Sequence, residues 1–189
     1  MRWQQLFADL QAQFEEEETA AERGESASRA RAEIGAVALA QRLRGAEGDM
    51  LSLRCGAAGQ VNGALREVGA DWLLVEDEQG RSSLVATSAV RAVSGLGRRT
   101  AVAEEVGVVR SRLDLRRALR GLARDRSAVQ VVLDDGSRLS GTLDRVGADY
   151  VELAEHPLDV PRRAEAVQRV SALVIGAIAV VRSVSPGMD

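Results

Sequence analysis

Apolar and polar residues alternate over short stretches in two regions of the chain, one in each half. Alternation with a period of two predicts β-strands with one buried face, and glycines between the stretches suit bends and bulges. The first region predicts five strands, over Met50–Cys55, Gly59–Val68, Asp71–Glu76, Ser83–Ala86 and Ala89–Ser94. The second predicts strands around Val129–Leu133, Leu139–Leu143 and Tyr150–Leu153, and buried strand in the apolar run Ala172–Val181. Each half therefore predicts a small five-stranded β-barrel.

The two regions are copies of one sequence unit. Gly63–Trp72 matches Gly141–Tyr150 at six of ten positions, and both segments end in an aromatic residue. Leu43–Gly45 is repeated as Leu119–Gly121. Duplication is the simplest explanation, so we expect the same architecture twice. A last set of apolar positions is shared at a spacing of 88 residues, with Val85, Val90 and Val93 matching Leu173, Ile178 and Val181.

A helical pattern precedes each predicted barrel. An apolar face with helical spacing is formed before the second barrel by Leu115, Ala118, Leu119 and Leu122, and before the first by Ile34, Val37, Leu39 and Leu43. The stretch 95–109 contains three glycines and little periodicity, which is typical of a linker. The pattern divides the chain into an N-terminal helix (1–23), helix plus first barrel (24–95), linker (96–110), helix plus second barrel (111–184) and tail (185–189).

The N-terminal segment is predicted to form an acidic, amphipathic helix. Four consecutive glutamates, Glu15–Glu18, follow its apolar face, and three of the five Trp, Phe and Tyr residues of the chain lie within the first fourteen positions. Such a face could pack on the chain's own barrels or dock into a groove of a protein partner, and the sequence favours neither. A membrane is the least favoured surface, because the acidic run opposes anionic lipid. The candidate partner-binding residues are Trp3, Leu6, Phe7, Leu10 and Phe14.

Composition restricts the core and the charge. Hydrophobic residues make up 46 % of the chain and aromatic residues 3 %, so the core must be aliphatic. The 25 basic and 28 acidic residues give a net charge of −3, which by itself does not indicate a nucleic-acid partner. Every basic side chain is arginine, which suggests a GC-biased genome. Arginine must therefore also fill ordinary solvent-exposed positions.

Arginines repeat along the helix that precedes the second barrel, opposite its apolar face. A cationic stripe of this kind could follow nucleic-acid phosphates. The alternative is an ordinary solvated face on which arginine stands in place of lysine, partly paired with Asp114 and Asp125. No aromatic residues interleave with the stripe, so base stacking is not expected. The candidate nucleic-acid-binding residues are Arg112, Arg116, Arg117, Arg120 and Arg124.

Motifs for catalysis or metal binding do not occur in the sequence. His156 is the only histidine and lies in an inserted loop, without the oriented acid or nucleophile that a general base needs. Cys55 is the only cysteine and ends an apolar strand, which favours an inert core residue. We therefore expect no enzyme, no cofactor and no bound metal. We expect a soluble, cytoplasmic protein with no membrane partner. A single cysteine suits a reducing compartment, no signal peptide is recognised, and the longest apolar run is half as long as a membrane helix.

The strand pattern of the second copy resembles the Sm-like fold of RNA-associated proteins, which includes the bacterial host-factor RNA chaperones. The resemblance rests on the alternating strand and turn Val129–Gly136, followed by Gly141–Leu143, and on Ile175–Ile178, which is similar to the second motif of that family but lacks its arginine. It implies five-stranded bent barrels and association with RNA. The family holds a base with an Asp and an Asn, and the aligned positions here are Gly147 and Val151, and Gly69 and Leu73 in the first copy.

Two aspartates lie close to those positions, Asp71 and Asp149, and the Gly-Ala-Asp sequence around each favours a turn over a ligand contact. The sequence as a whole predicts a mainly β chain of two tandem Sm-like barrels, each preceded by an α-helix. The leading hypothesis is a non-enzymatic regulator that associates with RNA rather than DNA. The alternative is a protein-interaction scaffold with no nucleic-acid role. We expect a monomer, or a homodimer formed through barrel edge strands.

Overall fold

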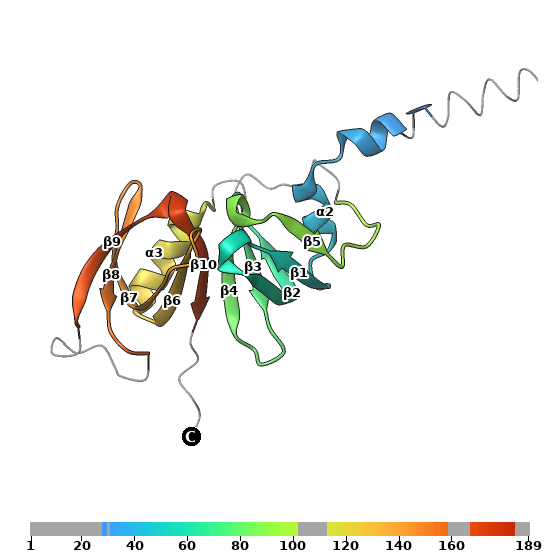
Figure 1. Cartoon of the computed structure of the whole chain (residues 1–189). Coiled ribbons are helices and arrows are strands. Elements are labelled where there is room, and N and C mark those ends of the chain that lie inside the picture. The colour runs from blue at the N-terminus through green and yellow to red at the C-terminus, as the bar shows by residue number, and fades with distance from the viewer. Residues whose placement is uncertain (1–27, 30, 102–112, 159–166, 184–189) are drawn as a thin grey trace, which may run out of the picture. The chain divides into compact units, whose positions relative to one another are not determined.

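The computed structural model describes residues 28–29, 31–101, 113–158 and 167–183. The chain forms two compact units, Met1–Leu39 and Ala40–Asp189. In the first unit, the described residues include a helical stretch at 31–36. The second unit holds both copies of the repeat and is mainly β, as the sequence predicts (Figure 1). Within the described residues, no helix is both long enough and apolar enough to span a membrane.

The helix predicted from Ile34 to Leu43 is interrupted. Residues 37 and 38 are not helical, and the N–H of Val37 bonds to the carbonyl of Ile34 at 3.2 Å. Helix resumes as α2, Leu39–Gly45. Gly35 and the β-branched Val37 both disfavour helix, which explains a break at this point. Leu43 is the member of the predicted apolar face that is buried.

The first copy of the repeat forms five strands close to their predicted positions. Short turns of 3-10 helix, η1 (Gly56–Ala58) and η2 (Thr87–Ala89), separate some of them. The last strand is shorter than predicted, because η2 takes up the start of its apolar stretch. The strands are β1 (Met50–Arg54), β2 (Gln60–Val68), β3 (Trp72–Glu76), β4 (Ser82–Ala86) and β5 (Ala92–Ser94).

The second copy begins with α3, Leu115–Asp125, which continues past Gly121 as Leu122 indicates. The apolar run 172–181 is divided between two strands by the 3-10 turn η6, Ile175–Ala177. That turn is the counterpart of η2, so the two copies share their turns as well as their strands. The strands are β6 (Ala128–Leu133), β7 (Arg138–Val146), β8 (Tyr150–Glu155), β9 (Arg169–Val174) and β10 (Ile178–Ser183).

The prediction of two separate closed barrels is wrong. All ten strands belong to one open antiparallel sheet in the order β5-β1-β2-β3-β4-β10-β6-β7-β8-β9. β5 and β10 each pair with the first strand of their own copy, and β4 then pairs with β10 of the other copy, beside which it lies in Figure 1. Alternation in a sequence fixes which face of a strand is buried, whereas it does not say which strand lies next to which edge.

The backbone irregularities repeat together with the sequence. The register of β2 shifts against β3 between Leu65 and Glu67, and the register of β7 shifts against β8 between Leu143 and Arg145. These are equivalent positions of the two copies. A shift of this kind marks a β-bulge, which bends and twists the strand that carries it. Both copies therefore curve their sheets at the same place.

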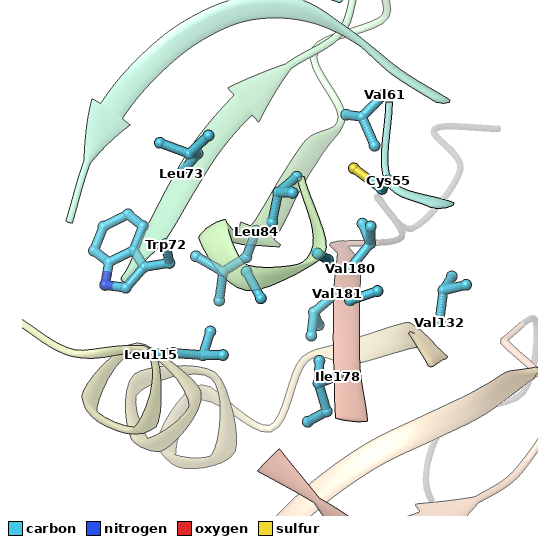
Figure 2. Packing of buried hydrophobic residues seen from close by; sticks show 14 of the residues in the cluster. Cys55, Val61, Trp72, Leu73, Leu84, Leu115, Val132, Ile178, Val180 and Val181 are labelled. Carbon is cyan, nitrogen blue, oxygen red and sulfur yellow. The ribbon is translucent and has the colours of Figure 1, made fainter. Parts of the chain in front are cut away.

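One aliphatic cluster fills the interior of both copies. It joins Leu84 of β4 to Val180 and Val181 of β10, across the line where the copies meet (Figure 2). Leu115 and Leu119 add the buried face of α3. Trp72, which is 6 % exposed, is the aromatic member of this cluster. The two copies thus share one core, as their shared sheet requires.

Candidate nucleic-acid interface

The arginine stripe lies on the solvent side of α3. The helix begins after Asp114, whose side chain accepts a hydrogen bond from the backbone N–H of Arg117 at 2.8 Å and so caps the first turn. Leu115 and Leu119 face the core and are 5 % and 0 % exposed. Burial of that face turns the opposite face outward, and its predicted members are Arg116, Arg117, Arg120 and Arg124.

The charges of this face are weakly neutralised by the described residues. The guanidinium of Arg116 lies 4.0 Å from a carboxylate oxygen of Asp114, and that of Arg124 lies 3.8 Å from one of Asp125. Both are long, solvent-exposed pairs, which contribute little energy. Within the described part of the chain, Arg117 and Arg120 have no ion pair. Their side chains are exposed, so a phosphate can reach them.

Two other groups of predicted site residues lie outside the described residues. Arg112 belongs to the segment 102–112, and the five partner-binding candidates Trp3, Leu6, Phe7, Leu10 and Phe14 belong to 1–27. Arg126 is a further cation that the predicted stripe does not contain. It follows α3 directly, is exposed, and has a left-handed backbone with φ of 52°. A sequence pattern based on helical spacing stops at the helix end, so it cannot include such a residue.

Carboxylates gather at the beginning of α3. Asp71, Asp114 and Asp149 line a hollow of about 460 Å³ together with Arg116. Their negative charge repels phosphate from this end of the helix. The cationic part of the face therefore begins at Arg117 and continues through Arg120 to Arg124 in the last turn of α3.

The side chain of Asp71 binds a residue that is distant in the sequence, whereas the sequence predicts a role in a local turn. One of its carboxylate oxygens accepts a hydrogen bond from the backbone N–H of Leu115 at 2.6 Å. Its main-chain carbonyl accepts from Thr87 at 2.9 Å, and the carbonyl of Asp149 accepts from the equivalent Ile175 at 2.8 Å. The backbone role is common to both copies, whereas the side chain of Asp71 caps the helix that begins the second copy.

The positions that correspond to the base-binding residues of the Sm-like family have packing roles. Leu73 and Val151 are fully buried. Gly69 and Gly147 lie beneath the rings of Trp72 and Tyr150, since a Cβ at either glycine would be 2.3 Å from a ring atom. These four positions offer no polar side chain to a base, as their residue types predict.

His156 lies in the loop after β8, as predicted, and it is buried. Its Nε2 lies 2.8 Å from the hydroxyl of Thr142, and its Nδ1 lies 2.8 Å from the carbonyl of Pro157. A carbonyl can only accept, so Nδ1 carries a hydrogen, and Nε2 of the neutral ring accepts from Thr142. Both ring nitrogens are thus used in holding the loop. This pairing was missed because it joins residues on different elements.

Cys55 is a buried free thiol, as its place at the end of an apolar strand predicts. Burial raises its pKa, and the charges of Arg182 and Arg91 oppose that rise. A thiol with a raised pKa is a poor nucleophile near neutral pH. The described residues also contain no group of three or more His, Cys, Asp or Glu side chains that could hold a metal ion.

Comparison with known proteins does not assign this chain to a family. No family model matches its sequence, and no curated protein is significantly similar to it.

Proposed function

We propose that this protein is a non-enzymatic regulator that binds the phosphate backbone of nucleic acid through the arginine face of α3. The observation that carries the proposal is the exposure of three arginines, Arg117, Arg120 and Arg124, on one side of a capped helix, with the half-exposed Arg116 beside them. Two of the three, Arg117 and Arg120, have no ion pair in the described part of the chain. RNA is the favoured nucleic acid, because the strand motifs of the second copy resemble those of RNA-associated proteins.

Binding of this kind depends on charge and reads little sequence. Guanidinium groups bind phosphate oxygens through paired N–H donors. The described residues place no aromatic side chain among these arginines, so stacking on bases does not contribute. Three phosphate contacts on a single strand, one for each of Arg117, Arg120 and Arg124, would give a slope of roughly −2 for the logarithm of affinity against the logarithm of salt concentration. We therefore expect binding that is strong at low salt and weak at physiological salt.

The test compares the full chain with the variant Arg117→Ala/Arg120→Ala by fluorescence anisotropy. The probes are a labelled single-stranded RNA, and duplex RNA and duplex DNA of matching sequence, each titrated at two salt concentrations. The expected result is a loss of affinity of at least tenfold for the variant, with a shallower salt slope. RNA should bind more tightly than DNA.

A matched control removes the same charge elsewhere. Arg54 and Arg138 are exposed and belong to β1 and β7. The variant Arg54→Ala/Arg138→Ala should retain the affinity of the unmodified chain. An equal loss in both variants would show that net charge alone governs binding, and would overturn the site. No binding to any probe at low salt would overturn the function.

A further inference from the structure

A cavity opens at the line where the two copies of the repeat meet. β4 of the first copy pairs antiparallel with β10 of the second, and this pairing is the β4–β10 joint. The cavity has a volume of about 580 Å³, which is typical of a small-molecule site. Most of its lining comes from β2, β4 and the turn between β3 and β4 in the first copy, and from β6 and β10 in the second. A ligand in this cavity would touch both copies.

The cavity lies where the apolar face of the joint ends. Val85 lies opposite Val180, and both side chains are fully buried. Two residues further along each strand, on the same face, the opposed pair is Ser83 and Arg182. Both of these polar side chains are half-buried. The apolar core of the joint therefore gives way to a polar space that solvent can enter.

Three polar side chains form a row across this end of the sheet. Ser83 lies directly opposite Arg182, and Gln130 lies directly opposite Arg182 on its other side. Directly opposed side chains have Cβ atoms about 5 Å apart, so neighbours in the row can contact the same bound group. All three side chains line the cavity, and none has a hydrogen bond or ion pair to the described residues. The row thus offers a hydroxyl, a guanidinium and an amide to a ligand.

Arg182 carries the unpaired charge of this cavity. Burial raises the pKa of the Cys55 thiol, and the charge of Arg182 opposes that rise, so the guanidinium acts on the covered interior. A partly buried charge without a partner is costly, and an anion bound beside it removes part of that cost. A guanidinium binds planar anions through two parallel N–H donors. Arg182 is therefore suited to hold an anionic group.

The other charges of the cavity favour a ligand with a single negative charge. Arg81 is not free, because its Nε donates to Asp77 at 2.7 Å and its Nη2 donates to the amide oxygen of Gln79 at 3.1 Å. Asp77 and Glu78 add negative charge to the same lining. These carboxylates repel a doubly charged phosphate more strongly than a singly charged carboxylate. One free guanidinium thus fits one carboxylate.

We propose that this cavity binds a small organic carboxylate, whose charged group is held by Arg182. The Gln130 amide and the Ser83 hydroxyl are the neutral donors beside it. Met50 and Val61 add apolar surface to the lining, which suits the uncharged body of the ligand. A ligand that contacts β4, β6 and β10 together stabilises the joint between the copies. The site is separate from the arginine face of α3 and goes beyond the function proposed for that face.

The test titrates the full chain with naphthoate, hexanoate and hippurate, which share one carboxylate and differ in the rest of the molecule. Each is compared with its uncharged amide by isothermal titration calorimetry. At least one carboxylate should bind at millimolar concentration or below, and its amide should bind at least tenfold more weakly. The bound carboxylate should also raise the melting temperature. In the unmodified chain, the Nε–H resonance of Arg182 should shift on saturation.

Two variants and two controls assign the binding to Arg182. Arg182→Gln removes a charge that bonds to no described residue, so the variant should fold and should lose at least tenfold in affinity. Arg182→Lys keeps the charge without the planar fork, and its affinity should be intermediate. Arg138→Gln removes an exposed arginine of β7 outside the cavity, and it should bind as the unmodified chain does. Arg117→Ala/Arg120→Ala should do the same, which separates this site from the α3 face.

Each of the following outcomes would overturn the proposal. An amide that binds as tightly as its carboxylate would remove the role of the charge. Equal losses in Arg182→Gln and Arg138→Gln, or an Arg182 resonance that does not shift, would place the binding elsewhere. Displacement of the carboxylate by an equal concentration of inorganic phosphate would contradict the ligand class. No binding by any of the three carboxylates at millimolar concentration would contradict the site itself. None of these readouts depends on nucleic acid.

Discussion

The indole N–H of Trp72 donates a hydrogen bond to the carbonyl of Leu113, at 2.8 Å between Nε1 and the oxygen. Leu113 lies just before α3, and its carbonyl also accepts from the backbone N–H of Ala70 at 3.2 Å. With the bond from Leu115 to Asp71, the turn that begins β3 in the first copy holds the start of the helix of the second. The copies are thus joined at this turn as well as along β4 and β10.

Replacement of Trp72 by Phe should weaken this second connection. An aromatic ring remains above Gly69, while the indole donor is lost. Leu113 keeps its bond from Ala70, so its carbonyl is not left unsatisfied. We expect the free energy of unfolding in urea to fall by about 1 kcal/mol for the hydrogen bond, with a further contribution from the smaller ring.

The matched control is Tyr150→Phe in the second copy. The Tyr150 hydroxyl has no hydrogen bond to the described residues, and the ring is 40 % exposed. This change should leave the unfolding free energy within about 0.5 kcal/mol of the unmodified chain. Equal losses in the two variants would contradict a specific role for the indole N–H.

Thr142 and His156 form a buried polar pair whose removal should be costly. Thr142→Val keeps the shape of the side chain but removes the hydroxyl that lies 2.8 Å from His156 Nε2. The ring nitrogen is then buried without a partner, which costs about 1 to 3 kcal/mol. Urea denaturation of Thr142→Val and Thr142→Ser measures the difference. Thr142→Ser keeps the hydroxyl and should lose less, and the reverse order would contradict the assignment.

The strands could be predicted because their alternation is local. Val129, Val131 and Leu143 are buried as their period-two pattern requires. The pairing of β4 with β10 could not be predicted, since both edges carry similar apolar residues and either could have closed its own copy. The choice between a closed barrel and a shared sheet depends on contacts between residues about one hundred positions apart. No periodicity within one strand reports such contacts.

In the candidate site, too, one part could be predicted from the sequence and another part could not. The exposure of Arg117 and Arg120 follows from the burial of Leu115 and Leu119 on the other face of α3, which the helical spacing already contains. The carboxylates at the start of that helix were not predicted to meet there. Asp71 reaches it from another copy of the repeat, through the fold rather than through the sequence.

Glu155 makes stability depend on pH in the acidic range. A hydrogen bond from Arg169, at 2.7 Å, holds the pKa of Glu155 below its ordinary value of 4.5, against burial and with help from the Ser171 hydroxyl. A carboxylate with a lowered folded-state pKa stabilises the fold above about 4.5 and loses that contribution as pH falls through the folded-state pKa. The melting temperature of the unmodified chain should therefore fall more between pH 5 and pH 3 than that of Glu155→Gln. Parallel falls in the two proteins would contradict this role.

The Cys55 thiol should report the opening of the core. The side chain is 2 % exposed, and burial raises its pKa above the ordinary value of 9.0, with Arg182 and Arg91 opposing. Since the reactive species is the thiolate, the folded chain at pH 8 should react with an aromatic disulfide reagent at least a hundredfold more slowly than the chain in concentrated urea. An added exposed cysteine, Ser94→Cys, provides the fast reference in the folded state. A Cys55 reaction as fast as that reference would mean that the strand end bearing this thiol is open to solvent, and would contradict a closed core beneath β1 and β10.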